Sequence, residues 1–72
     1  MKNIEVGDIV VVRESADSEH RLKRCLVLSD GPLVYMGLRT ERTWFLSSQH
    51  QNSMEFDYFW EPESNLIRFV QN

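Results

Sequence analysis

The residues with the clearest chemical potential lie around an apolar run in the first half of the chain. Arg24 opens the segment RCLVLS, and Thr40 ends a later apolar run, LVYMGLRT. A fixed guanidinium can bind two phosphate oxygens at once, and a nearby hydroxyl can orient the phosphate. Glu19 and His20, in the polar segment before this run, are candidates for a general base. If the fold brings these residues together, their types suit a site that binds and activates a phosphate ester.

The order of these segments resembles the beginning of the MazF/PemK toxins, which are endoribonucleases with an SH3-like barrel. The family pattern has a Gly-Asp-Ile-Val strand, a loop, an Arg-Pro pair opening an apolar strand that ends in Ser, and a further strand that ends in Thr. Residues 7–10 match the first part, Arg24 and residues 27–29 match the second, and Thr40 stands at the threonine position. The resemblance implies cleavage of single-stranded RNA without a metal ion.

Two positions depart from this family pattern. Cys25 stands where the pattern has proline, and a cysteine in the middle of a strand usually packs as a small apolar side chain. Glu41 follows Thr40 where the pattern often has serine, and its carboxylate repels a phosphate. A shortened ribonuclease and a barrel without this activity are both open interpretations, since one fold hosts many functions.

A second candidate site combines aromatic rings and carboxylates near the C-terminus. Period-two alternation in residues 55–60 places Phe56, Tyr58 and Trp60 on one face of a strand. A core of this size cannot enclose all of the chain's aromatic rings, and exposed rings bordered by charge are typical of protein interfaces. We predict a surface that binds a protein partner, such as a nucleic-acid enzyme that it inhibits or regulates, and assign to it Trp60, Tyr58, Asp57, Glu61 and Glu55.

A third candidate set is basic. It predicts association with RNA or the ribosome and comprises Arg13, Arg21, Lys23, Arg24, Arg39 and Arg42. The net charge of the chain is −3, whereas a protein that relies on phosphate contacts usually has a basic excess. A protein partner is therefore preferred over RNA.

The composition favours a cytoplasmic protein that acts without a cofactor or a metal ion, as a monomer or a homodimer. A single cysteine suits a reducing compartment, and the segment MKNIEVGD lacks the apolar stretch of a signal peptide. No apolar run approaches the roughly 20 residues that span a membrane, so no membrane association is expected. His20 and His50 lie in separate polar segments without further ligands in view.

The hydrophobic pattern predicts one all-β domain over residues 1–72, a small SH3-like barrel of five to six short antiparallel strands. Strands are expected at 8–13, 22–29, 33–39, 43–47, 55–60 and 65–70. Turns are expected at Asp30-Gly31-Pro32, where glycine and proline favour chain reversal, and at 40–42. A 3₁₀ turn is expected at 61–64. The tail is interpreted as a closing strand, because a helix of six residues nucleates poorly.

Overall fold

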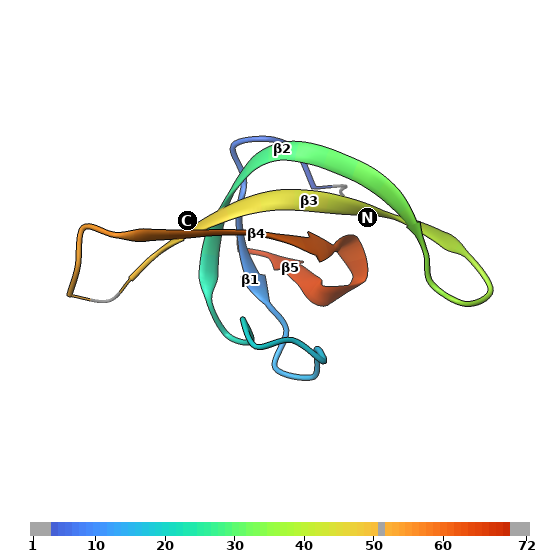
Figure 1. The fold of residues 1–72 in the computed structure, drawn as a ribbon, viewed down its shortest axis with the longest axis horizontal. Helices are drawn as coiled ribbons and strands as arrows, with labels where there is room; N and C mark the ends of the chain where they lie inside the picture. The colour runs from blue at the N-terminus through green and yellow to red at the C-terminus, as the bar shows by residue number, and fades with distance from the viewer. Residues whose placement is uncertain (1–3, 51, 70–72) are drawn as a thin grey trace.

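The computed structural model describes residues 4–50 and 52–69, which form one antiparallel sheet of five strands (Figure 1). The strands are β1 (Ile9–Val12), β2 (Arg24–Tyr35), β3 (Thr40–Gln49), β4 (Phe56–Pro62) and β5 (Leu66–Arg68). One turn of 3₁₀ helix, η1 (Glu63–Asn65), joins the last two strands. The sheet order is β4-β3-β2-β1-β5, so the first and last strands of the chain pair with each other. The prediction of an all-β domain is confirmed.

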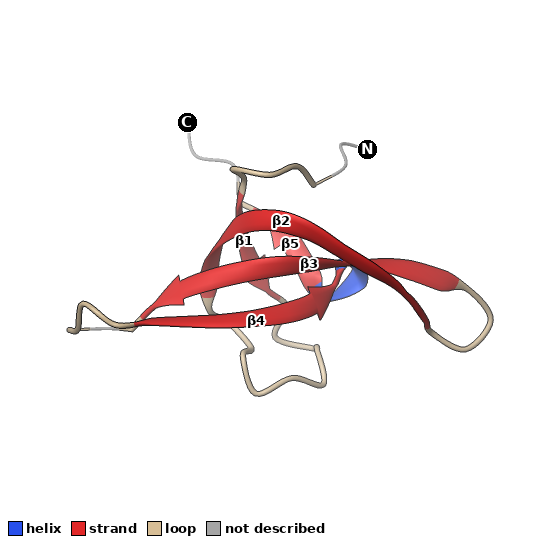
Figure 2. Ribbon diagram, turned by 45° about the horizontal axis from the view of Figure 1, so that its top comes forward, coloured by secondary structure: helices blue, strands red, loops and turns tan. Residues whose placement is uncertain are grey.

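The sheet is strongly curved. Figure 2 shows β1 and β5 crossing behind the layer of β2, β3 and β4, with η1 beside the end of β4. β4 and β5 are the two edges of the sheet in the part of the chain that the structure describes. The fold therefore turns back on itself, and closure into a complete barrel stays a prediction.

The core lies on the inner side of this curve and consists mainly of small branched side chains. Val10 and Val12 of β1 are completely buried, as is Leu46 of β3. Cys25 and Val27 of β2 add to them from the neighbouring strand. β-Branched residues suit this position because their restricted side-chain torsion costs little in a strand.

The predicted turn at Asp30-Gly31-Pro32 is wrong, because β2 continues through these residues to Tyr35. The pairing of β2 with β3 shifts register between Asp30 and Leu33, which accommodates the proline. A Cβ atom at Gly31 would lie 2.5 Å from Cε3 of Trp60 and 2.6 Å from Oγ1 of Thr43. Glycine is present because a ring packs on the backbone, and not because the chain reverses.

The hairpin turn lies after Tyr35 instead. The backbone N–H of Met36 donates to the carbonyl of Arg39 over 2.7 Å, and Gly37 has a φ of +77°. Gly37 thus serves the turn, where a left-handed conformation favours glycine, and not a bulge in a strand. The predicted turn at 40–42 is also wrong, since these residues begin β3.

Two further strand boundaries differ from the prediction, namely the beginning of β2 and the end of β3. Leu22 has a φ of +68°, which interrupts the extended chain, so β2 begins at Arg24. β3 extends to Gln49, two residues beyond the end of the strand expected at 43–47.

The C-terminal segment follows the prediction closely. The expected 3₁₀ turn is η1, displaced by two residues, and the expected closing strand is β5. A helix over residues 66–68 is thereby excluded. Val70, the last residue of the predicted strand, lies outside the described residues.

We expect substitution of Gly31 by alanine to destabilise the fold by about 1–3 kcal/mol, because the new methyl group overlaps the Trp60 ring and Thr43. Denaturant unfolding measures the change. In a Trp60→Ala background the same substitution should cost less, since its main clash is gone. An equal cost in both backgrounds would show that the ring contact is not the reason for glycine.

Candidate functional site

Three aromatic side chains project from the outer face of β4, as the alternation predicts. Phe56, Tyr58 and Trp60 are 47%, 60% and 50% exposed. Phe45 of β3 joins them, with ring centroids 4.6 Å from Trp60 and 6.1 Å from Tyr58. The Phe56 and Tyr58 centroids are 6.5 Å apart. We call these four residues the aromatic surface.

The strand register explains why the rings gather. Phe45 is directly opposite Trp60, and such cross-strand aromatic pairs stabilise a sheet. Ser47 is opposite Tyr58 on one side and Leu26 on the other, so an uncharged row continues onto β2. Leu26 is 39% exposed. Sequence analysis missed Phe45 and Leu26 as site residues, because only the register places them beside Tyr58.

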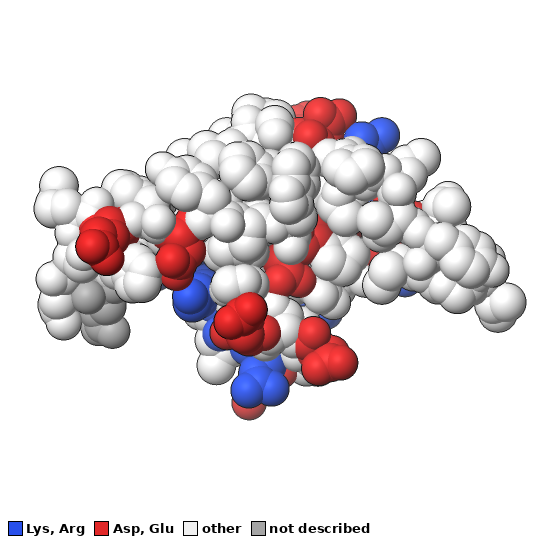
Figure 3. All heavy atoms as spheres, in the orientation of Figure 1, with Lys and Arg blue, Asp and Glu red and all other residues white. Residues whose placement is uncertain are grey.

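The predicted combination of aromatic rings and carboxylates on one surface is wrong. Asp57 and Glu61 alternate with the exposed rings and face the inner side of β4, while Glu55 is exposed just before the strand. In Figure 3, uncharged side chains cover most of β2 and β3 apart from acidic and basic groups at the upper right, and other charged side chains lie along β4 and below it. The aromatic surface is therefore largely free of the carboxylates expected around it.

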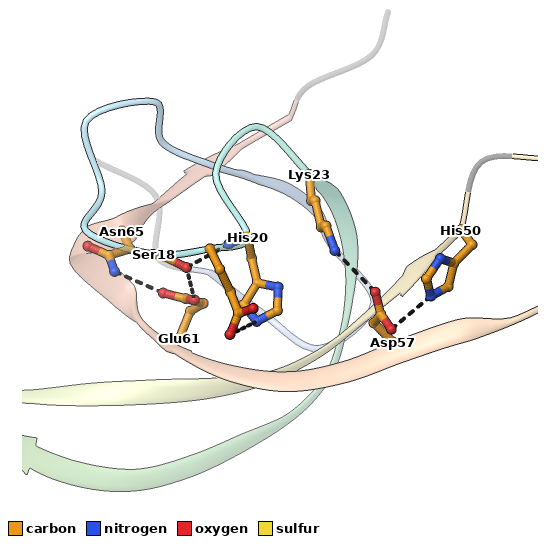
Figure 4. Close-up of polar contacts among 8 residues, drawn as sticks. Ser18, His20, Lys23, His50, Asp57, Glu61 and Asn65 are labelled. Carbon is orange, nitrogen blue, oxygen red and sulfur yellow. Dashed lines mark hydrogen bonds and ion pairs between the residues drawn. The ribbon is translucent and has the colours of Figure 1, made fainter.

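Glu61 is a buried structural carboxylate. Only 5% of the residue is exposed, which excludes it from a contact surface. Ser18 donates its hydroxyl to Oε2 over 2.6 Å, and Asn65 donates its amide to Oε1 over 2.8 Å (Figure 4). A carboxylate taken out of water requires such donors, so Glu61 fixes the β1–β2 loop and η1 to the end of β4.

The same loop covers the rest of the inner face of β4. The ring of His20 stacks on Phe59 at a centroid distance of 3.7 Å and an angle of 10°. Lys23 donates to Asp57 over 3.1 Å, and His50 lies 2.9 Å from the other carboxylate oxygen of Asp57 (Figure 4). The hydrogen bonds from Lys23 and then His50 lower the pKa of Asp57 from its ordinary value. Asp57 is thus already engaged within the molecule.

The residues of the predicted ribonuclease site are not brought together. Arg24 begins β2 opposite Val11, while Thr40 begins β3 opposite Tyr35, the last residue of β2. These positions are at opposite ends of a long strand, on the order of 30 Å apart along its path. The guanidinium of Arg24 lies over the ring of Phe69, 4.9 Å from its centroid.

The two proposed base residues adjoin each other. Glu19 is exposed, with Oε1 4.0 Å from Nε2 of His20. His20 covers β4 by stacking on Phe59, whereas the side chain of Glu19 is 89% exposed to solvent. Nothing in their contacts links them to Thr40.

The predicted basic set divides into two groups. Arg13, Arg39 and Arg42 line one cavity, whereas Arg21, Lys23 and Arg24 do not contribute to it. Arg68 also lines this cavity and was missed. The sequence did contain a signal for Arg68. A closing strand that contains Arg68 was expected, and β5 pairs with β1, the strand that Arg13 directly follows.

Other kinds of site are not evident in residues 4–50 and 52–69. No group of three or more His, Cys, Asp and Glu side chains there is arranged to hold a metal ion. No helix in that part of the chain has the length and apolar character needed to cross a membrane. Comparison of the chain with protein-family models, with curated proteins and with solved structures finds no significant match.

We expect the Asp57 contacts to stabilise the fold in a pH-dependent way. Because the folded-state pKa is below the ordinary 3.8, the contribution is full above about pH 4 and is lost as the pH falls through the folded-state value. Asp57→Asn should therefore be less stable than the unmodified protein near neutral pH, and the difference should shrink on acidification. Urea unfolding at a series of pH values measures this. Glu55→Gln is the matched control, and an Asp57→Asn deficit that persists at the lowest pH contradicts the prediction.

Cys25 should behave as a core residue and not as a nucleophile. Burial raises its pKa to about 11, so only about one thiol in a thousand is ionised at pH 8. We expect alkylation by iodoacetamide to be roughly a hundredfold slower in the folded protein than in urea. Equal rates in the two states would show that Cys25 is accessible.

Proposed function

We propose that this protein is a small binding module whose aromatic surface docks a segment of a partner protein. The observation that supports this most directly is the stacked group of Phe45, Phe56, Tyr58 and Trp60, of which the three rings on β4 are about half exposed. Exposing such rings to water is unfavourable, and aromatic residues are enriched at the centres of protein interfaces.

The charge distribution favours a protein over a nucleic acid. The register places uncharged residues along the outer face of β3 and β4, namely Phe45, Ser47, Gln49, Phe56, Tyr58 and Trp60. A nucleic acid could stack its bases there but would find no cations among these outer-face positions for its phosphates, since Arg42 of β3 lines the separate cavity. An apolar protein segment needs no such charges.

The position of β4 in the sheet gives a partner a second means of attachment. β4 pairs with β3 on one side and is an edge of the sheet on the other, within the described residues. An exposed edge presents backbone donors and acceptors to which an extended segment can add as a further strand. Alternate side chains of that segment would then lie beside Phe56, Tyr58 and Trp60.

We expect Tyr58→Ala to weaken partner binding by about thirtyfold or more, the loss typical of a central aromatic contact. Tyr58 is preferred to Trp60 for this test because it does not pack on Gly31 and its removal should leave the fold intact. Tyr35→Ala is the matched control, since Tyr35 is 74% exposed at the other end of the β2–β3 hairpin.

Affinity capture with the three tagged proteins, from extract of the source cells with and without nuclease treatment, measures the difference by quantitative mass spectrometry. A protein retained by the unmodified chain and by Tyr35→Ala, and lost with Tyr58→Ala, supports the proposal once the purified pair gives the same ranking. Partners that Tyr58→Ala captures equally well, or capture that requires intact RNA, would refute it. Self-association through Tyr58 in sedimentation experiments would identify the partner as a second copy and would also refute docking of another protein.

A further inference from the structure

A cavity of about 710 Å³ lies away from the aromatic surface, between the beginning of β3 and the η1–β5 segment. Four arginines line it, Arg13, Arg39, Arg42 and Arg68, together with two glutamates, Glu41 and Glu63. Asp30 and Asp8 pair with two of these arginines, Arg42 and Arg68, so the charges around the cavity balance overall. An anionic ligand therefore depends on guanidinium groups that still have free donors.

Two of the arginines are neutralised within the molecule. Arg42 lies 3.2 Å from a carboxylate oxygen of Asp30, and Arg68 lies 3.2 Å from a carboxylate oxygen of Asp8. These pairs shape the wall of the cavity but leave it little free charge.

The other two arginines remain available to a ligand. Arg13 uses its Nε–H to donate to the carbonyl of Ser64 over 2.7 Å, which fixes the guanidinium, and it has no carboxylate partner among the described residues. Its two terminal nitrogens are then left as a planar pair of donors, suited to two oxygens of one phosphate. Arg39 is 70% exposed, and its only ion pair in that part of the chain is a long one of 3.7 Å to Glu41.

Glu41 favours a ligand that carries a hydrogen-bond donor. One oxygen accepts a hydrogen bond from the backbone N–H of Ser64, and the side chain is only 10% exposed. The other oxygen, Oε2, is buried and lies 3.7 Å from a terminal nitrogen of Arg39, but it has no hydrogen-bond partner in the described structure. A buried acceptor left unpaired is costly, so a ligand that brings an N–H or O–H donor to this oxygen gains affinity.

We propose that the cavity binds a small phosphate monoester whose organic part carries hydrogen-bond donors, with nucleoside 5′-monophosphates as the class that fits. Arg13 and Arg39 bind the phosphate, and Glu41 accepts a hydrogen bond from the base or the sugar. Thr40 and Ser64 also line the cavity, and side-chain hydroxyls can bind phosphate oxygens. The volume lies in the usual range of about 300–1,000 Å³ for small-molecule sites.

Titration of the ¹⁵N-labelled protein, followed by NMR at low ionic strength, tests this proposal. The probes are the four ribonucleoside 5′-monophosphates, ribose 5-phosphate, inorganic phosphate and an unphosphorylated nucleoside. We expect at least one nucleotide to bind with a Kd below about 1 mM, with shifts at Arg13, residues 39–42 and residues 63–64. Ribose 5-phosphate distinguishes a donor on the sugar from a donor on the base.

Single substitutions test what each side chain contributes to ligand binding. Arg13→Gln should weaken nucleotide binding about tenfold or more, and Arg13→Lys, which keeps the charge but loses the planar pair of donors, should recover only part of it. Arg24→Gln is the matched control, because Arg24 is an exposed arginine outside the cavity. Glu41→Gln should weaken binding of the nucleotide and strengthen binding of inorganic phosphate, since the repelling charge is gone.

Four results would overturn the proposal, provided that the spectra show folded variants. These are the absence of shifts at the cavity up to about 10 mM ligand, equal affinity of Arg13→Gln and the unmodified protein, equal binding of the unphosphorylated nucleoside, and inorganic phosphate binding as tightly as every monoester. The last would identify a site for the free anion alone.

Discussion

The presentation of the aromatic surface depends on how the inner face of β4 is held. Glu61 is buried with its carboxylate hydrogen-bonded by Ser18 and Asn65, and the neighbouring inner positions are covered by the same β1–β2 loop. A carboxylate in this environment is tolerated only with its donors in place, so the loop cannot leave without a large cost. Because residues alternate along a strand, fixing the inner side also fixes the direction of Tyr58 and Trp60 on the outer side.

The two proposed sites use the same long hairpin at different points. Phe45 of β3 completes the aromatic surface, while Thr40 and Glu41, at the beginning of that strand, line the arginine cavity. The four rings of the aromatic surface suit an apolar protein segment, whereas the free guanidinium donors of Arg13 in the cavity suit a small anion. The curvature of the sheet separates these chemistries within a molecule of 72 residues.

In the middle of the chain, residue types alone did not distinguish a turn from a continuous strand. Asp30-Gly31-Pro32 has the residues of a turn, yet Gly31 lies within β2 because the ring of Trp60 occupies the space of a side chain there. Trp60 is 29 positions away in sequence, so no local pattern reports the contact. The same limitation applies to Arg24 and Thr40, which match a family pattern in order but stand at opposite ends of a strand.

The sequence by itself determined the all-β class, the first strand, the shared face of Phe56, Tyr58 and Trp60, and the short turn before a closing strand. Each of these follows from period-two alternation or from the residues of a single segment. Only the tertiary structure decided that Asp57 and Glu61 face inward to the β1–β2 loop, and that Arg13 shares a cavity with Arg39 and Glu41. The reason is physical: register and sheet curvature arise from packing between distant segments, and they decide which charges meet.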